Sequence, residues 1–480
     1  MSARTPPRLL DLAGRHLLRA DDLDSSTLES LPTELFPPLF LEAFDGYRTE
    51  TLKAMVQTWP FVRLPLRALI ELPHVGPLQA VLEALDVLLA QKTRSRCKLR
   101  VLDLRNTGQN FWSMWLGASS DGCSSSREAA VAEPRSTTKR PSTPLKVFID
   151  LCLKKRSLDN FLTYFLRWVE QRRSSVHLCC KKLKIVSMPM DSIVKVLSMV
   201  QLDCIQEVQV SCTWNLSTLA TFAPFLGEMS NLQRLRLSHV HGSAFKKQEH
   251  DHVVQITSQL RRLGHLRDLH LESSSFLGGC LDQMLRCLKS PLDSLSITKC
   301  WLTESDLTHL SQSPDISQLK SLDLSGVTMT DFRPELLPVL LERVAATLQE
   351  LDLDVCGITD CQLEAFLPAL SRCSQLRFFS LCGNLLSTAV MEKLLRHTAA
   401  LPCLRQERYP APQESYRPRG VLPEARLAQL RAQLLEILRD LGKPRIIWIG
   451  LCPCPRCGED SRSLGHDEGN TDSGFHTFSQ

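Results

Sequence analysis

The chain has 480 residues, of which 43% are hydrophobic and 23% charged, with a formal net charge of +5. This composition is that of a globular protein, and without a long block of one charge sign it does not argue for nucleic-acid binding. No run of about 18 apolar residues would span a membrane, and the first residues lack the apolar core and cleavage site of a secretory signal. We therefore expect the 18 cysteines to lie in a reducing compartment, mostly as free thiols.

The first expected element is a helical N-terminal cap at residues 1–95, which begins with a short apolar motif. Leu9, Ala13 and Leu17 are spaced four residues apart, so they would share one stripe of a helix. This spacing resembles the elongin-binding box of ubiquitin-ligase receptors. The match is imperfect, because Ala13 stands where Cys is usual and Arg8 stands where Pro or a small residue is usual.

A second motif lies in the stretch LPTELFPPLF at 31–40, which holds three prolines. Every position of the cullin box found in such receptors is matched here, by Leu31, Pro32, Leu35 and Leu39. We expect Pro32 to open a helix, where its missing N–H costs nothing, and Pro37 and Pro38 to limit the length of that helix. The alternative is that both motifs are ordinary cap helices that bury one end of the fold.

Leucines recur along most of the chain in the pattern LxxLxL. Seven copies begin at positions 99, 232, 266, 292, 319, 348 and 376, and weaker copies begin at 183 and 205. From 232 onward the copies start 34, 26, 27, 29 and 28 residues apart. This spacing is typical of leucine-rich repeats, in which each copy supplies a strand, a turn and a helix. We therefore expect an α/β solenoid, a horseshoe whose parallel strands line the concave side.

The residues after each strand predict how the repeats are joined. A small polar side chain that can satisfy turn backbone groups recurs at one register, as Cys300, Cys356 and Asn384. Three residues later the chain holds expected helix N-caps, namely Thr303, Thr330, Thr359 and Ser387. Two of them resemble capping boxes, Thr303 with Asp306 and Thr359 with Gln362.

Changes in composition divide the chain further. The segment 117–144 is rich in Ser and Pro and the segment 458–480 is polar and glycine-rich, so we expect both to be disordered. An amphipathic helix at 423–442, ending at Gly442, is expected to cap the last repeat. The expected organisation is a cap at 1–95, a first repeat at 96–116, an insertion at 117–144, repeats at 145–422, a C-terminal cap at 423–457 and a tail at 458–480.

Motifs that carry chemistry are few. Cys454 and Cys457 have zinc-knuckle spacing, but a structural zinc needs four ligands and no second CxxC follows, so we expect no metal. The sequence holds no nucleotide-binding loop, nucleophile elbow or HExxH motif. We therefore expect neither catalytic residues nor a cofactor.

Several stretches resemble the PRAME family, which comprises the melanoma-associated antigen and its relatives. They include RTPPRLLDLAGRHLLRADDL, LESLPTELFPPLFLEAF, LKAMVQTWPFVRLPL, LDLSGVTMT, LDLDVCGITD and ERYPAPQESY. The resemblance implies a substrate receptor of cullin–RING ubiquitin ligases, with elongin B and C, a cullin and a RING subunit as partners. It also implies negative regulation of transcription, apoptosis and differentiation, and positive regulation of proliferation.

On this interpretation the chain is a binding protein without catalysis of its own, located in the cytoplasm with the nucleus as a second compartment. Residues 9–39 would hold the ligase scaffold, and direct contact with nucleic acid or a membrane is not expected. The alternative is a ligase-independent interaction scaffold or transcriptional co-repressor. A receptor would leave residues 9–39 exposed, whereas a plain scaffold would bury them.

The concave face would hold a protein substrate through the side chains that alternate with the inward leucines. The expected substrate-binding residues are Arg234, Arg236, Asp268, Glu272, Asp323, Glu350, Asp352, Asp354 and Phe378. Glu350, Asp352 and Asp354 share one strand, and their mutual repulsion costs stability that we expect folding not to require. We therefore expect the substrate to present a basic or arginine-bearing segment to residues 350–354.

Overall fold

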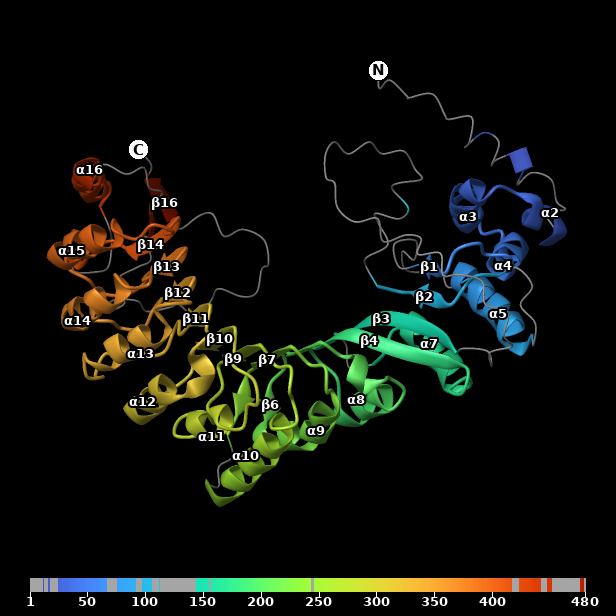
Figure 1. Cartoon of the computed structure of the whole chain (residues 1–480), viewed down its shortest axis with the longest axis horizontal. Helices are drawn as coiled ribbons and strands as arrows, with labels where there is room; N and C mark the ends of the chain where they lie inside the picture. Colours follow the sequence, from blue (N-terminus) through green and yellow to red (C-terminus); the bar gives the residue numbers. More distant parts are fainter. Residues whose placement is uncertain are drawn as a thin grey trace. The chain divides into compact units, whose positions relative to one another are not determined.

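The computed structural model describes most of the chain and divides it into two compact units (Figure 1). The first unit is made of Met1–Leu183 and Met188–Ile205, and the second of Lys184–Ser187 and Gln206–Gln480. The described residues are 12, 16–17, 25–66, 76–91, 97–105, 112, 144–154, 157–242, 246–416, 423–441, 447–450 and 475–478. The expected insertion lies outside these residues apart from Pro144, and so does the cysteine pair Cys454 and Cys457.

The first unit combines a helical cap with four strands in the order β1-β2-β3-β4. Strands β1, β2 and β3 are parallel and in register. Its elements are α2 (Ser25–Ser30), η1 (Thr33–Leu35), α3 (Phe36–Asp45), α4 (Thr49–Gln57), β1 (Arg63–Pro65), α5 (Gly76–Ala90), β2 (Val101–Asp103), β3 (Leu145–Leu153), α7 (Asn160–Glu170), β4 (Val176–Ile185, up to Leu183 in this unit), α8 (Met190–Leu197) and η3 (Leu202–Cys204). The cap is built on aromatic rings, with Phe40 lying 5.2 Å from Trp59 and 5.8 Å from Trp112 between ring centroids.

The prolines of the 31–40 stretch begin a helix rather than end one. Pro32 precedes η1, and Pro37 and Pro38 lie in the first turn of α3. The first N–H groups of a helix have no intrahelical partner, so proline costs little there. The expectation that Pro37 and Pro38 limit a helix opened by Pro32 is therefore wrong, and α3 continues to Asp45.

The second unit contains the regular repeats. Its elements are β5 (Glu207–Val210), β6 (Trp214–Asn215), α9 (Leu216–Glu228), β7 (Arg234–Ser238), β8 (Val240–His241), α10 (Lys246–Leu260), β9 (Asp268–Glu272), α11 (Leu281–Leu285), β10 (Ser294–Thr298), α12 (Glu304–Gln312), η4 (Pro314–Ile316), β11 (Ser321–Asp323), α13 (Leu336–Val344), β12 (Glu350–Asp352), α14 (Asp360–Leu370), β13 (Phe378–Ser380), α15 (Thr388–Thr398), β14 (Gln406–Pro410), η5 (Gln413–Ser415), α16 (Glu424–Leu441), β15 (Ile447–Gly450) and β16 (Phe475–Phe478). Helices α11 to α15 lie along one side of the strands and leave the other side open (Figure 1).

Parallel pairing in equal register confirms the leucine-rich-repeat fold in this unit. Strands β5, β7 and β9 to β15 follow one another in a single parallel order. The second leucine position of successive copies stacks into one buried column, made of Leu235, Leu269, Leu295, Leu322, Leu351 and Phe379. Strand β16 pairs antiparallel with β15, so the expectation of disorder throughout 458–480 is wrong for residues 475–478.

Side-chain caps join strand and helix within the repeats largely as expected. Thr303 and Thr359 form capping boxes with Asp306 and Gln362, and the Ser387 side chain accepts a hydrogen bond from the Val390 N–H. Thr330 does not cap a helix, because α13 begins only at Leu336, after Pro334. At the small polar register, Asn384 Oδ1 accepts from the N–H groups of Cys356 at 3.1 Å and Ile358 at 2.9 Å.

After each of six strands, β7 and β9 to β13, the chain turns through a residue in the left-handed conformation. These residues occupy one register and have φ between 49° and 74°, at His239, Ser273, Lys299, Gly326, Val355 and Gly383. Glycine adopts this conformation without penalty, whereas a β-branched side chain is strained there. Val355 is such a residue, and its side chain is also 60% exposed. The repeat geometry therefore imposes a local cost at Val355 that Gly326 and Gly383 avoid.

The 14 cysteines that the structure describes are free thiols, half of them buried. Burial raises the pKa of the Cys180 and Cys373 thiols to about 12. Among the described residues, none of the helices has the length and apolar character needed to cross a bilayer. Within the same residues, no group of His, Cys, Asp or Glu side chains is arranged to hold a metal ion.

Candidate functional site

Six carboxylates gather on the open side of the repeat strands, and we call this group the acidic face. Its members are Asp268, Glu272, Asp323, Glu350, Asp352 and Asp354. They come from β9, β11, β12 and the turn after β12. Because the strands pair in register, Asp323 lies directly beside Asp352, and Ser321 lies beside Glu350.

A shallow depression of about 450 Å³ opens within the acidic face. Its lining combines three carboxylates, Asp268, Asp323 and Glu350, with Arg236, His270, Leu269 and serines of β10 and β11. Four of the nine expected substrate-binding residues, Arg236, Asp268, Asp323 and Glu350, therefore line one hollow. A lining of hydroxyls and charges suits a polar polypeptide segment better than an apolar small molecule.

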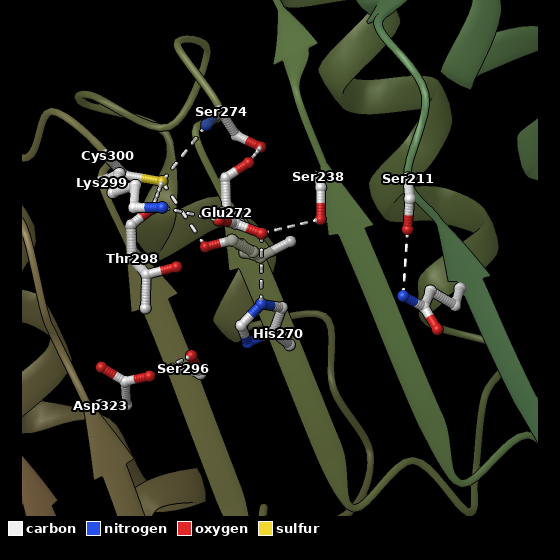
Figure 2. A network of polar contacts seen from close by, with 12 residues as sticks. Ser211, Ser238, His270, Glu272, Ser274, Ser296, Thr298, Lys299, Cys300 and Asp323 are labelled. Carbon is white, nitrogen blue, oxygen red and sulfur yellow. Dashed lines mark hydrogen bonds and ion pairs between the residues drawn. The ribbon is translucent and has the colours of Figure 1, made fainter. Parts of the chain in front are cut away.

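Glu272 is already held by its neighbours, as Figure 2 shows. Its carboxylate accepts from Ser238 Oγ and from Lys299 Nζ, both at 3.2 Å, and lies 4.0 Å from His270 Nε2. Burial raises the pKa of Glu272, but Lys299 and Ser238 outweigh that effect and leave the pKa below its usual value. Burial lowers the pKa of His270, so this imidazole is neutral near pH 7. Glu272 therefore stays ionised while Lys299 balances much of its charge.

The aspartates that follow the second leucine of a copy have a folding role that sequence analysis missed. Asp323 Oδ1 accepts from the Ser325 N–H at 2.9 Å, and Asp352 Oδ1 accepts from the Asp354 N–H at 3.0 Å. Such a side chain satisfies a backbone donor where the strand ends. The recurrence of Asp at this position of the pattern was the available signal.

Asp354 is also tied into the fold. Its Oδ1 accepts from Ser380 Oγ at 2.5 Å and from the Cys382 N–H at 2.6 Å. The fold therefore uses the side-chain oxygens of Asp352 and Asp354 as hydrogen-bond acceptors, so the expectation that these side chains have no role in folding is wrong for both residues. Glu350, which is exposed, has only the Ser321 hydroxyl as a hydrogen-bond donor among the described contacts.

The charge of the acidic face depends on pH. Burial, together with the neighbouring carboxylates Asp354 and Asp323, raises the pKa of Asp352 to about 7. Burial also raises the pKa of Asp354. A cation placed against Asp352 would stabilise its ionised form, so binding of a basic segment and ionisation of this group are coupled.

The remaining predicted residues lie beside the acidic face. Arg234 approaches Glu207 at 3.8 Å and Asp268 at 3.7 Å, and Arg236 is exposed. Phe378 is half-buried, with the Arg408 guanidinium 5.4 Å from its ring centroid. Arg408 was missed, because it lies in β14, whose sequence QERYP lacks the leucine pattern.

Comparison with known proteins identifies the family. A model of the PRAME N-terminal domain matches residues 6–112, and a model of the PRAME C-terminal domain matches residues 145–467. The chain belongs to the PRAME family. PRAME family member 8 of Homo sapiens is 53% identical over 465 residues, covering 95% of this chain and 97% of the relative.

Other members of the PRAME family are similar over comparable lengths. PRAME family member 12 of Homo sapiens is 53% identical over 463 residues, which covers 95% of each chain. PRAME family member 10 of Homo sapiens is 44% identical and covers 95% of this chain and 97% of its own. The crystal structure of the Rad7 and Elc1 complex in yeast is similar at 15% identity with a TM-score of 0.35, over 53% of this chain and 71% of that chain. A likeness this weak carries no argument.

Part of the PRAME N-terminal domain contains the residues expected to bind a ligase scaffold. Leu9 and Ala13 lie outside the described residues, and Leu17 is half-buried. In the second motif Pro32 is exposed, while Leu31 and Leu35 are half-buried. Leu39 is only 1% exposed, because it falls on the inner face of α3. Leu39 therefore belongs to the cap core, and a partner could reach only the 31–35 part of the motif in this conformation.

Proposed function

We propose that this PRAME-family chain is the non-catalytic substrate-recognition subunit of a cullin–RING ubiquitin ligase. Elongin B and C, a cullin and a RING subunit would bind the N-terminal cap, and the repeats would hold the protein to be modified. The chain would then raise the effective concentration of substrate lysines near a charged conjugating enzyme. We propose that it acts in the cytoplasm and also in the nucleus, where loss of its substrates would restrain transcription, apoptosis and differentiation and favour proliferation.

The observation that carries this proposal is the polar, partly exposed segment between α2 and α3. Pro32, Thr33 and Glu34 are exposed and precede a helix that is otherwise packed into the cap. The half-buried Leu31 and Leu35 flank them. A partner helix could cover this segment without disturbing the aromatic core around Trp59.

The acidic face supports the proposal that the repeats bind the protein to be modified. Membership of the PRAME family does not identify a substrate. The six carboxylates on one open side of the sheet favour a substrate with a basic polypeptide segment. Glu350 is the most available of them, since it is exposed. Asp352 would contribute once a cation draws its pKa of about 7 downward.

The decisive experiment is affinity purification of the full chain followed by probing for elongin and cullin. The double variant Pro32→Ala/Leu35→Ala should lose the cullin while its melting temperature stays close to that of the parent, because neither side chain is fully buried. Truncating anchor residues of a helix contact typically costs about 2 kcal/mol or more. Val62→Ala is the matched control, since Val62 is an apolar side chain of the same unit that is 57% exposed.

Retention of cullin by the double variant would show that the 31–35 segment is not the contact. A large fall in melting temperature would instead assign these residues to the cap core. The second candidate function, a ligase-independent scaffold or co-repressor, is favoured by the burial of Leu39. It predicts that the parent chain brings down neither elongin nor cullin.

A further inference from the structure

One guanidinium group at the edge of the hollow in the acidic face has no ion-pair partner in the described part of the chain. Arg236 of β7 is exposed and lines the hollow. Arg234, two residues earlier on the same strand, approaches Glu207 at 3.8 Å and Asp268 at 3.7 Å. The charge of Arg236 acts on Asp268 and His270 through space, without an ion pair to either. Arg236 is therefore available to a bound ligand.

The opposite side of the hollow has unpaired charge of the other sign. Asp323 accepts from Ser296 Oγ at 2.9 Å, and Glu350 accepts from Ser321 Oγ at 3.0 Å. These donors are neutral, and so is the Ser325 N–H that also bonds Asp323. Within the described residues, neither carboxylate forms an ion pair with a cation. This side of the hollow therefore keeps its negative charge.

The two charged sides are too far apart to neutralise each other. Strand pairing places four residues on one rung of β7, β9, β10 and β11, namely Arg236, His270, Ser296 and Asp323. Figure 2 shows the last three of them on successive strands. Burial lowers the pKa of His270, so its imidazole and the Ser296 hydroxyl are both neutral near pH 7. Three strand spacings separate Arg236 from Asp323, which is a distance of about 14 Å.

We propose that the substrate segment held in this hollow carries an acidic side chain against Arg236 and a basic side chain against Asp323 and Glu350. An extended chain covers about 14 Å in about four residues, and residues four apart on it point to the same side. The expected pattern is therefore an acidic and a basic residue about four positions apart. This inference rests on the proposed role of the acidic face in holding the substrate. A uniformly basic segment fits less well, because one of its cations would lie against Arg236.

Fluorescence anisotropy of labelled peptides with blocked termini, titrated with the full chain at low ionic strength, tests the proposal. The spaced peptide is Glu-Ser-Gly-Ser-Arg-Arg-Arg, and the neutral peptide has Gln in place of Glu. The adjacent peptide, Ser-Gly-Ser-Glu-Arg-Arg-Arg, has the composition of the spaced one. Each is also made in reverse order, because either chain direction fits the rung. In one direction the spaced peptide should bind about threefold more tightly than the other two, the strength of an exposed ion pair.

The variant Arg236→Gln should reverse this preference. Without the guanidinium group the acidic face responds to net charge, so the neutral peptide, which has one positive charge more, should bind most tightly. Arg261→Gln is the matched control, because Arg261 is an exposed arginine that follows α10 and does not line the hollow. This control should keep the preference of the parent chain for the spaced peptide.

Three outcomes would overturn the proposal. They are a parent chain that binds the neutral peptide at least as tightly as the spaced one in both directions, one that binds the adjacent peptide as tightly as the spaced one, and an Arg236→Gln variant with unchanged preference. In each case tight binding of the arginine-bearing peptides would still support a basic segment as substrate. A parent chain that binds none of the peptides would overturn the substrate site as well, whereas purification with cullin tests the ligase role separately.

Discussion

Asp103 of the first unit and Asp352 of the second occupy the same place in the repeat but have opposite surroundings. Each follows the second leucine of its copy and accepts a hydrogen bond from the backbone N–H two residues later. Asp103 then lies between two arginines, whereas Asp352 lies beside Asp354 and Asp323. The turn accounts for the aspartate in both units, and only the neighbouring side chains differ. The local charge therefore depends on the side chains around this aspartate, which has the same structural role in both units.

The largest effect is expected for the variant Asp103→Asn. The amide can still accept from the Arg105 N–H, but Arg63 and Arg105 lose their shared counter-charge. Removing one partner of a buried ion pair destabilises the fold, here by about 3 kcal/mol. Chemical denaturation at neutral pH measures the effect. A loss below about 1 kcal/mol would mean that Asp103 contributes little to balancing the two arginines.

The corresponding variant Asp352→Asn should have the opposite effect. The pKa of Asp352 is raised to about 7 in the folded state, so its ionised form is disfavoured there. Above pH 7 the parent chain carries this cost and the asparagine variant does not, so the variant should be more stable by roughly 2 kcal/mol. As the pH falls from about 7 toward the unfolded value, Asp352 takes up a proton and the advantage should disappear. Denaturation at pH 8 and pH 5 measures the decline of this advantage.

If Asp352→Asn raises the free energy of unfolding equally at pH 8 and at pH 5, the raised pKa of Asp352 is contradicted. Asp268→Asn serves as a comparison, because burial also raises its pKa but Arg234 opposes the shift. Its dependence on pH should therefore be weaker than that of Asp352→Asn.

Removal of charge from the acidic face should weaken the binding of a basic peptide. The pair Glu350→Gln/Asp352→Asn keeps the side-chain oxygens that accept from Ser321 and from the Asp354 N–H. It should weaken capture of a labelled hexaarginine peptide about tenfold while leaving elongin binding unchanged. Titration by anisotropy at matched salt measures this. Undiminished capture would remove residues 350–354 from the proposed substrate site.

The smallest expected effect concerns the turn after β12. Val355→Gly should stabilise the chain by about 0.5 kcal/mol, because relief of the left-handed strain exceeds the added freedom of the unfolded chain. Lys299→Gly, at the same register with an unbranched side chain, should gain less. Thermal melts of both variants provide the measurement. Destabilisation by Val355→Gly would show that its exposed side chain makes contacts that outweigh the strain.

Local and periodic features of the fold were predictable from the sequence. Leucine spacing gave the strands, and Thr303, Thr359 and Ser387 gave the helix starts. Features that depend on spatial neighbours were not predictable. Asp354 meets Ser380 and Cys382 only because β12 and β13 pair, and Arg408 reaches Phe378 from a strand that lacks leucines. The role of Pro37 and Pro38 was predicted wrongly because proline can either begin a helix or end the preceding one, and the sequence alone does not distinguish these two roles.

The reactivity of the buried thiols in the second unit can report which part of the repeats unfolds first. Cys300, Cys356, Cys373 and Cys382 lie in successive parts of the second unit, each at most 5% exposed. Burial holds the pKa of Cys373 at about 12 and raises that of Cys356 further above its usual value, so neither forms a reactive thiolate while folded. A thiol reagent can then modify each position only when its repeat transiently unfolds. The order in which the four sites are labelled would report where the solenoid first comes apart.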